Sequence, residues 1–80
     1  MKKEKKHLYI RWCEQGGLGW YTYEYKNYND FLIHIFNRGV GTRYCWICGV
    51  WVNENRIYKS IQRLCDIKED LEILINAEMK

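Results

Sequence analysis

Hydrophobic and polar residues alternate in two stretches near the start of the chain. Large hydrophobic residues take every second position from residue 8 to residue 12, and a tyrosine does so from residue 21 to residue 25. This period of two is typical of strands with one buried face. Three glycines lie between the two stretches, in residues 15–19, and glycine permits the backbone angles of a tight turn. The pattern predicts an antiparallel hairpin over residues 7–26.

The most hydrophobic run of the sequence is residues 44–52. Only Tyr44 has a strongly polar group there, and the other residues are almost all aromatic, β-branched or cysteine, the types that favour strands. A continuous hydrophobic run of this length indicates a strand covered on both faces. We predict that it is the central strand of a small sheet.

The segment between the hairpin and this strand has the spacing of a helix. Hydrophobic residues lie at i, i+1, i+4 and i+5 from Phe31, which places them in one stripe. Asn27 can cap the start of this helix, and Gly39 can end it in the left-handed conformation.

Two further helices are predicted after the central strand. Hydrophobic residues recur at i, i+4, i+7 and i+8 from Ile57, and a similar stripe begins at Ile67. The capping pair Asp66 and Glu69, together with a change in the sign of the charge, predicts a helix start at Asp66. A single long, bent helix through Asp66 is the alternative.

The predicted elements follow the order β-β-α-β-α-α in one α+β domain, residues 1–80. Because three strands cannot bury their hydrophobic faces alone, the helices must cover them. The expected fold is a small three-stranded antiparallel sheet packed against helices. Residues 1–6 include four lysines and are expected to form a flexible tail.

Charge is distributed unevenly along the chain. Residues 1–65 contain eleven Lys and Arg against five Asp and Glu, a net +6, whereas residues 66–80 contain two against five, a net −3. The basic part suits an acidic partner. The 48% of hydrophobic residues excludes a disordered chain. The longest hydrophobic run is about half of the roughly 20 residues of a membrane span, so we expect a cytoplasmic protein with reduced cysteines and no membrane partner.

The chemical motif in the sequence is Cys45-x-x-Cys48-Gly49, which has the spacing of a zinc knuckle. A zinc site needs two more ligands, and the remaining cysteines and histidines include no second close pair. In a regular strand, moreover, Cys45 and Cys48 project from opposite faces. We therefore expect no metal and no other cofactor, and a small structural zinc protein stays an alternative. Its further ligands would come from Cys13, Cys65, His7 and His34.

No catalytic motif accompanies these residues. The sequence contains neither a Walker loop nor a Gly-x-Ser-x-Gly turn, and neither histidine has an evident acid or nucleophile as its partner. We predict that the protein is not an enzyme.

The predicted hairpin is the candidate binding surface. If its register brings aromatic and cationic residues onto one face, they can stack the bases of single-stranded nucleic acid or form a protein-binding hot spot. An arginine just before the central strand adds a further cation. The candidate binding residues are Tyr9, Arg11, Tyr21, Tyr23, Tyr25 and Arg43.

The leading functional hypothesis is a non-enzymatic module that binds another protein, because the chain is small, rich in Tyr and Trp, and split in charge. Its aromatic, lysine-tipped composition resembles that of small phage or mobile-element proteins that inhibit host defence nucleases, such as anti-CRISPR inhibitors. The resemblance implies a steric block of a nucleic-acid-processing complex. Homodimerisation through an exposed sheet face is also expected. The alternative is a nucleic-acid-binding module that uses the basic, tyrosine-rich hairpin.

Overall fold

The computed structural model describes residues 5–80, so most of the predicted tail lies outside the described residues. Four strands and two helices follow one another in the order β-β-α-β-β-α. They are β1 (Leu8–Glu14), β2 (Tyr21–Tyr25), α1 (Tyr28–Asn37), β3 (Cys45–Val52), β4 (Asn55–Arg63) and α2 (Leu64–Met79).

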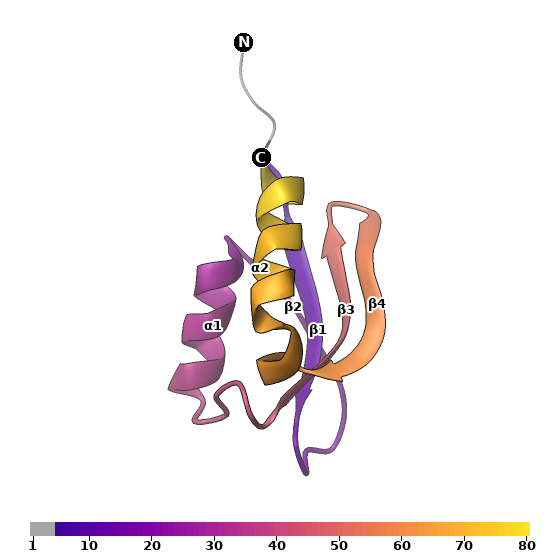
Figure 1. Ribbon diagram of the computed structural model, residues 1–80. Helices are drawn as coiled ribbons and strands as arrows, with labels where there is room; N and C mark the ends of the chain where they lie inside the picture. The colour runs from indigo at the N-terminus through magenta and orange to yellow at the C-terminus, as the bar shows by residue number, and fades with distance from the viewer. Residues whose placement is uncertain (1–4) are drawn as a thin grey trace.

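The strands form one antiparallel sheet in the order β2-β1-β3-β4, and both helices lie on the same face of it (Figure 1). The predicted α+β class and antiparallel sheet are confirmed. The prediction of three strands is wrong, and so is the predicted order of elements. Strand β3 lies inside the sheet as predicted, but the helices cover only one of its two faces.

The predicted second helix is instead strand β4. The spacing from Ile57 to Ile61 fits both structures, because four residues are about one helical turn and also two repeats of a strand. A hairpin turn between β3 and β4 favours the strand: Asn53 adopts a left-handed φ of 56°, which asparagine tolerates better than most residues. Ile61 is 63% exposed on the edge strand, whereas the helix stripe would have buried it.

The helix termini show how the chain enters and leaves α1 and α2. The predicted caps of α1 are present: Asn27 Oδ1 accepts a hydrogen bond from the backbone N–H of Asp30 at 2.8 Å, and Gly39 has a φ of 76°. Helix α2 begins at Leu64, so Asp66 lies in its first turn and is not its cap. There a carboxylate still favours the positive end of the helix dipole.

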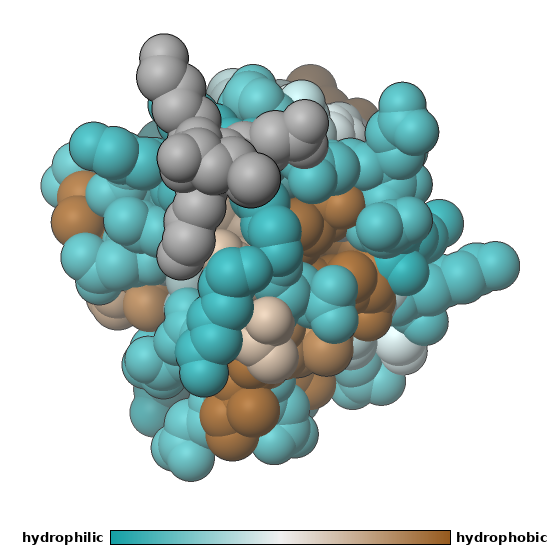
Figure 2. Space-filling view, turned by 90° about the horizontal axis from the view of Figure 1, so that it is seen from above, coloured by the Kyte–Doolittle hydropathy of each residue, from teal (hydrophilic) through white to brown (hydrophobic). Residues whose placement is uncertain are grey.

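The core lies between the two helices and the face of the sheet that they cover. Helix α2 packs on β3 and β4, and α1 packs on β2. Trp12 of β1 is the largest fully buried side chain. Figure 2 shows the end of the molecule that bears the β3–β4 turn, where hydrophobic residues gather between hydrophilic rims.

The two ends of the described chain meet at this end of the molecule. The Lys6 ammonium donates hydrogen bonds to the carbonyl oxygens of Glu78 and Lys80, at 2.8 and 2.6 Å. These carbonyls lie at the C-terminus of α2, where a cation is favoured by the helix dipole. Among residues 5–80, neither helix has both the length and the hydrophobicity that a membrane span requires.

Candidate functional site

The register of the N-terminal hairpin divides the predicted binding residues between the two faces of the sheet. Tyr23 pairs with a fully buried isoleucine of β1. Tyr21 and Tyr25, two residues away on either side, therefore share with it the face that the helices cover. Tyr9 and Arg11 lie on the opposite face. The structure therefore does not bring the three tyrosines of β2 onto the surface that holds Tyr9 and Arg11.

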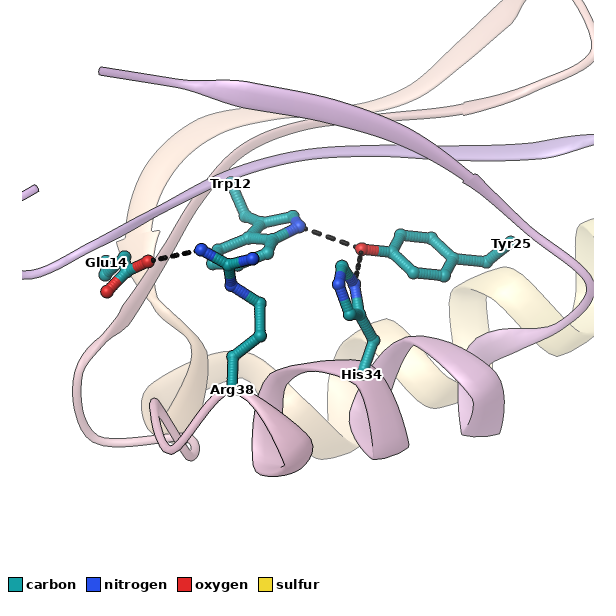
Figure 3. A network of polar contacts seen from close by, with 5 residues as sticks. All are labelled: Trp12, Glu14, Tyr25, His34 and Arg38. Atoms are coloured by element: carbon teal, nitrogen blue, oxygen red, sulfur yellow. Dashed lines mark hydrogen bonds and ion pairs between the residues drawn. The ribbon is translucent and has the colours of Figure 1, made fainter. Parts of the chain in front are cut away.

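On the helix-covered face Tyr25 belongs to a polar network inside the protein (Figure 3). The indole N–H of Trp12 donates to the Tyr25 hydroxyl at 2.9 Å, and this hydroxyl lies 2.7 Å from His34 Nδ1. Because the phenol oxygen accepts from the indole, its own proton can go to His34 Nδ1. Burial raises the pKa of Tyr25 to about 12. The phenol is therefore a structural group in a satisfied interior network.

Arg38 lies at the solvent-exposed edge of this network. Its guanidinium lies 5.9 Å from the ring centroid of Trp12 and 5.8 Å from that of Tyr21. It also donates to Glu14 Oε1 at 3.1 Å, and this hydrogen bond raises the pKa of Arg38. Of the three hairpin tyrosines, Tyr23 is the most exposed, at 37%, and Tyr21 is half-buried beside Arg38.

The other face of the sheet has no helix over it, and we call it the open face. An antiparallel sheet usually presents polar residues on such a face. Here β1 and β3 present half-buried aromatic residues, which lie outside the hydrophobic core, and cations flank them on β1 and β4. The strand registers assign to this face Tyr9, Arg11, Cys13, Trp46, Gly49, Trp51, Arg56, Lys59 and Arg63.

A β-bulge brings the two tryptophans of β3 onto the open face. Trp46 and Trp51 are five residues apart, so a regular strand would project them from opposite faces. The pairing of β1 with β3 shifts between Arg11 and Trp12, and Cys48 is the extra residue of β3. A bulge places two residues of one strand opposite one of its partner. The period is thereby shifted by one residue, and both indoles lie on the same side.

Each of these tryptophans is stacked by an arginine of β4. The Arg56 guanidinium lies 4.7 Å from the ring centroid of Trp51, and that of Arg63 lies 5.0 Å from the ring centroid of Trp46. The two arginines are the direct register partners of the tryptophans they cover. Such cation–π pairs hold a ring and a cation in fixed positions. The result is two tryptophan–arginine pairs near the two ends of the β3–β4 ladder.

Gly49 determines how the Trp51 ring lies. A Cβ atom at this position would be 2.6 Å from Trp51 Cη2 and 2.8 Å from Arg56 Nη2. The edge of the indole therefore lies against the glycine, and the guanidinium also lies close to this position. The same guanidinium donates to the Cys48 carbonyl at 2.8 Å, so the bulge, the ring and the cation fix one another.

The open face is cationic. Arg11 and Lys59 are the register partners of Gly49 on its two sides, and both are exposed. Glu24 on β2 presents its carboxylate on this face, where it contacts His7 Nδ1. Four cations thus surround two indoles and a phenol.

The cysteines of the Cys-x-x-Cys motif are placed differently from one another. Cys45 is fully buried on the helix-covered side, and burial raises its pKa to about 12. Cys48 is the half-buried residue of the bulge. Burial also raises the pKa of Cys13. In the part of the chain that the structure describes, no three His, Cys, Asp or Glu side chains are grouped so that they could hold a metal ion.

Most of the open face is absent from the binding residues predicted from the sequence. Tyr9 and Arg11 are among them, but the tryptophans of β3 and the cations of β4 are not. Arg43, which is also among them, is exposed in the turn before β3 and is not part of the sheet. A usable signal was the recurrence of Arg and Lys in residues 56–63, which the helix prediction obscured.

Comparison with known proteins gives no relative from which to assign a function. No family model matches the chain, and neither a curated protein nor a solved structure matches it. The function must be argued from the geometry of the protein itself.

Proposed function

We propose that this protein binds single-stranded nucleic acid on the open face of its sheet. The proposal rests on one observation: Trp46 and Trp51 lie on a helix-free face, each stacked by an arginine. Stacking of a base on an aromatic ring contributes about 1–3 kcal/mol and depends little on the base, because every base has a π-face. Arginine supplies the phosphate contacts that accompany such stacking.

The shape of the site supports a single strand and not a duplex. Reading a DNA duplex usually needs an element that enters the major groove, and both helices lie on the far side of the sheet (Figure 1). A sheet surface with aromatic rings is instead the surface on which unpaired bases are stacked in RNA-binding domains. Trp51 is the register partner of Tyr9, which offers a third ring next to it.

The four cations of the open face predict how binding depends on salt. Each phosphate neutralised on a single strand contributes about −0.7 to the slope of log K against log salt concentration. If Arg11, Arg56, Lys59 and Arg63 each contact one phosphate, the slope is about −3. Replacing Arg56 with glutamine should make the slope shallower by about 0.7.

The test is a fluorescence anisotropy titration with a labelled ten-nucleotide single strand. Trp51→Ala should weaken binding by between about 5-fold and 150-fold, the equivalent of one lost stacking contact. Trp20→Ala is the matched control, because Trp20 is 37% exposed and lies in the loop before β2. It should leave the affinity within about twofold.

Two results would overturn the proposal. One is the absence of binding to DNA or RNA single strands at low salt. The other is an equal loss of affinity in the two tryptophan variants, which would mean that binding does not use the open face.

Protein binding is the second candidate, and exposed hydrophobic residues on the helices favour it. Ile33 and Phe36 of α1 are 48% and 59% exposed, and Ile73 of α2 is 70% exposed. A protein bound there would leave the open face available. Inhibition of a defence nuclease by steric block stays a prediction that this surface would support. The absence of enzymatic activity, the lack of a cofactor, homodimerisation and the cytoplasmic location also stay predictions.

A further inference from the structure

A depression lies where the open face ends at the β3–β4 turn. Its volume is about 470 Å³, and its lining residues are His7, Tyr9, Asn53, Glu54 and Asn55. This volume is in the range of about 300–1,000 Å³ found for pockets that hold small molecules. Figure 2 looks onto the end of the molecule at which this turn lies, where most of the surface is hydrophilic.

The depression continues the stacking surface. Tyr9 lines it, and Tyr9 is the register partner of Trp51. A nucleotide that follows one stacked on Trp51 would therefore have its base beside the phenol ring and within reach of the turn. The depression is thus the place at which a bound strand can be read by hydrogen bonds.

The wall of the depression is held rigidly. The backbone N–H of His7 donates to Asn53 Oδ1 at 2.9 Å, and the backbone N–H of Asn53 donates to the His7 carbonyl at 2.8 Å. The Asn53 side chain therefore has its oxygen occupied and its NH₂ group available as a donor. Groups fixed in this way before a ligand arrives lose little entropy when they bind it.

Glu54 supplies the complementary acceptor. Among residues 5–80, the ion pairs of the structure do not involve its carboxylate, and the side chain is exposed and lines the same depression as Asn53. A carboxylate accepts two hydrogen bonds from neighbouring donors. An amide NH₂ next to it can donate to a carbonyl oxygen.

We infer that this depression binds an unpaired guanine of the single strand. Guanine presents O6 as an acceptor beside N1–H and N2–H₂ as two adjacent donors, which matches the Asn53 amide and the Glu54 carboxylate. Adenine and cytosine each place a ring-nitrogen acceptor beside their amino group, and uracil and thymine flank one donor with two acceptors. These bases would direct an acceptor at the carboxylate. The inference rests on the proposed function, because the strand must first lie on the open face.

The test compares four ten-nucleotide strands of deoxythymidine, one unbroken and the others with a single central guanine, adenine or hypoxanthine. The strand with guanine should bind between about 5-fold and 150-fold more tightly than the unbroken strand, which is the usual discrimination of a bidentate contact. Adenine should give no gain. Hypoxanthine, which lacks the N2 amino group, should give a smaller gain than guanine.

The matched variant is Glu54→Gln. It should bring the ratio of the affinity for the guanine strand to the affinity for the unbroken strand down to about one, while the unbroken strand still binds. The ratio is the right quantity, because removing a negative charge alters the affinity for every strand alike. Glu69→Gln on α2 is the control and should keep the ratio.

The outcomes separate the two proposals. Trp51-dependent binding with no preference for guanine, or a preference that Glu54→Gln leaves intact, would overturn the guanine site alone. Failure of all four strands to bind would overturn the proposed function itself.

Discussion

The two faces of the sheet use the same kinds of residue for opposite purposes. On the helix-covered face, Trp12 and Tyr25 are buried, hydrogen-bonded to each other and packed among other rings. On the open face, Trp46 and Trp51 are half-buried and each contacts one arginine. Aromatic content alone therefore does not identify a binding surface. The decisive property is whether an aromatic ring has its polar and apolar partners inside the protein or faces solvent beside a cation.

The largest expected difference between the two faces is in stability. Trp12→Ala should lower the free energy of unfolding by about 3–5 kcal/mol, since it removes a fully buried ring and leaves the Tyr25 hydroxyl without its donor. Trp51→Ala should lower it much less, because one side of that ring is already in water. Urea unfolding of the two variants measures both values. Equal losses would mean that the two faces are not distinct in this way.

The buried hydroxyl and thiol of the covered face should make the protein less stable in alkaline solution. Burial raises the pKa of Tyr25 and of Cys45 to about 12, from ordinary values of 10 and 9. Above about pH 9 the unfolded chain therefore releases protons that the folded protein keeps, so the free energy of unfolding falls as the pH rises towards 12. Each group contributes a fall of about 1.4 kcal/mol per pH unit within its own window.

Urea titrations at successive pH values, with a reductant present, test this dependence. Cys45→Val should remove a large part of the fall between pH 9 and pH 10, where the thiols of Cys45 and Cys13 contribute and the Tyr25 hydroxyl does not yet. A stability that stays constant from pH 9 to pH 11 in the unaltered protein would contradict the burial of these groups.

The smallest expected effect concerns the position of one ring on the open face. Gly49→Ala introduces a Cβ that would lie 2.6 Å from Trp51, so the indole must tilt away from the sheet. We expect the affinity for a single strand to fall by about 5-fold, the lower end of one stacking contact, and the loss of stability to be smaller than that caused by Trp12→Ala. Gly19→Ala is the matched control, because no atom lies within 4 Å of its added Cβ. Identical affinities of the two variants would mean that the position of the Trp51 ring does not affect binding.

Much of the fold follows from local patterns in the sequence. The alternation in β1 and β2, the hydrophobic run of β3 and the caps of α1 at Asn27 and Gly39 each depend on a few neighbouring residues. Such features can be read without tertiary information. Strand β4 could not be predicted in this way, because the spacing of Ile57 and Ile61 suits a helix and a strand equally. Its identity depends on pairing with β3 across the Asn53 turn.

The open face was harder to predict for two physical reasons. Within one strand of a hairpin, the alternation in the sequence tells which residues share a face. The register across the loop decides which residues of the neighbouring strand lie on that same face. The tyrosines of β2 therefore lie on the same face of the sheet as Trp12, and Tyr9 lies on the other face. The bulge at Cys48, which reverses the face of every later residue in β3, has no clear signal in the sequence except the neighbouring Gly49.

The most direct test of the account uses the indole N–H signals of the four tryptophans in a proton–nitrogen correlation spectrum, assigned with single Trp→Phe variants. Addition of a single-stranded ten-nucleotide strand should shift or broaden the signals of Trp46 and Trp51. The signals of Trp12, whose N–H is bonded to Tyr25, and of Trp20 in the loop should stay in place. A bound strand that moves the signal of Trp12 or Trp20 and leaves those of Trp46 and Trp51 unchanged would contradict the assignment of the open face as the binding site.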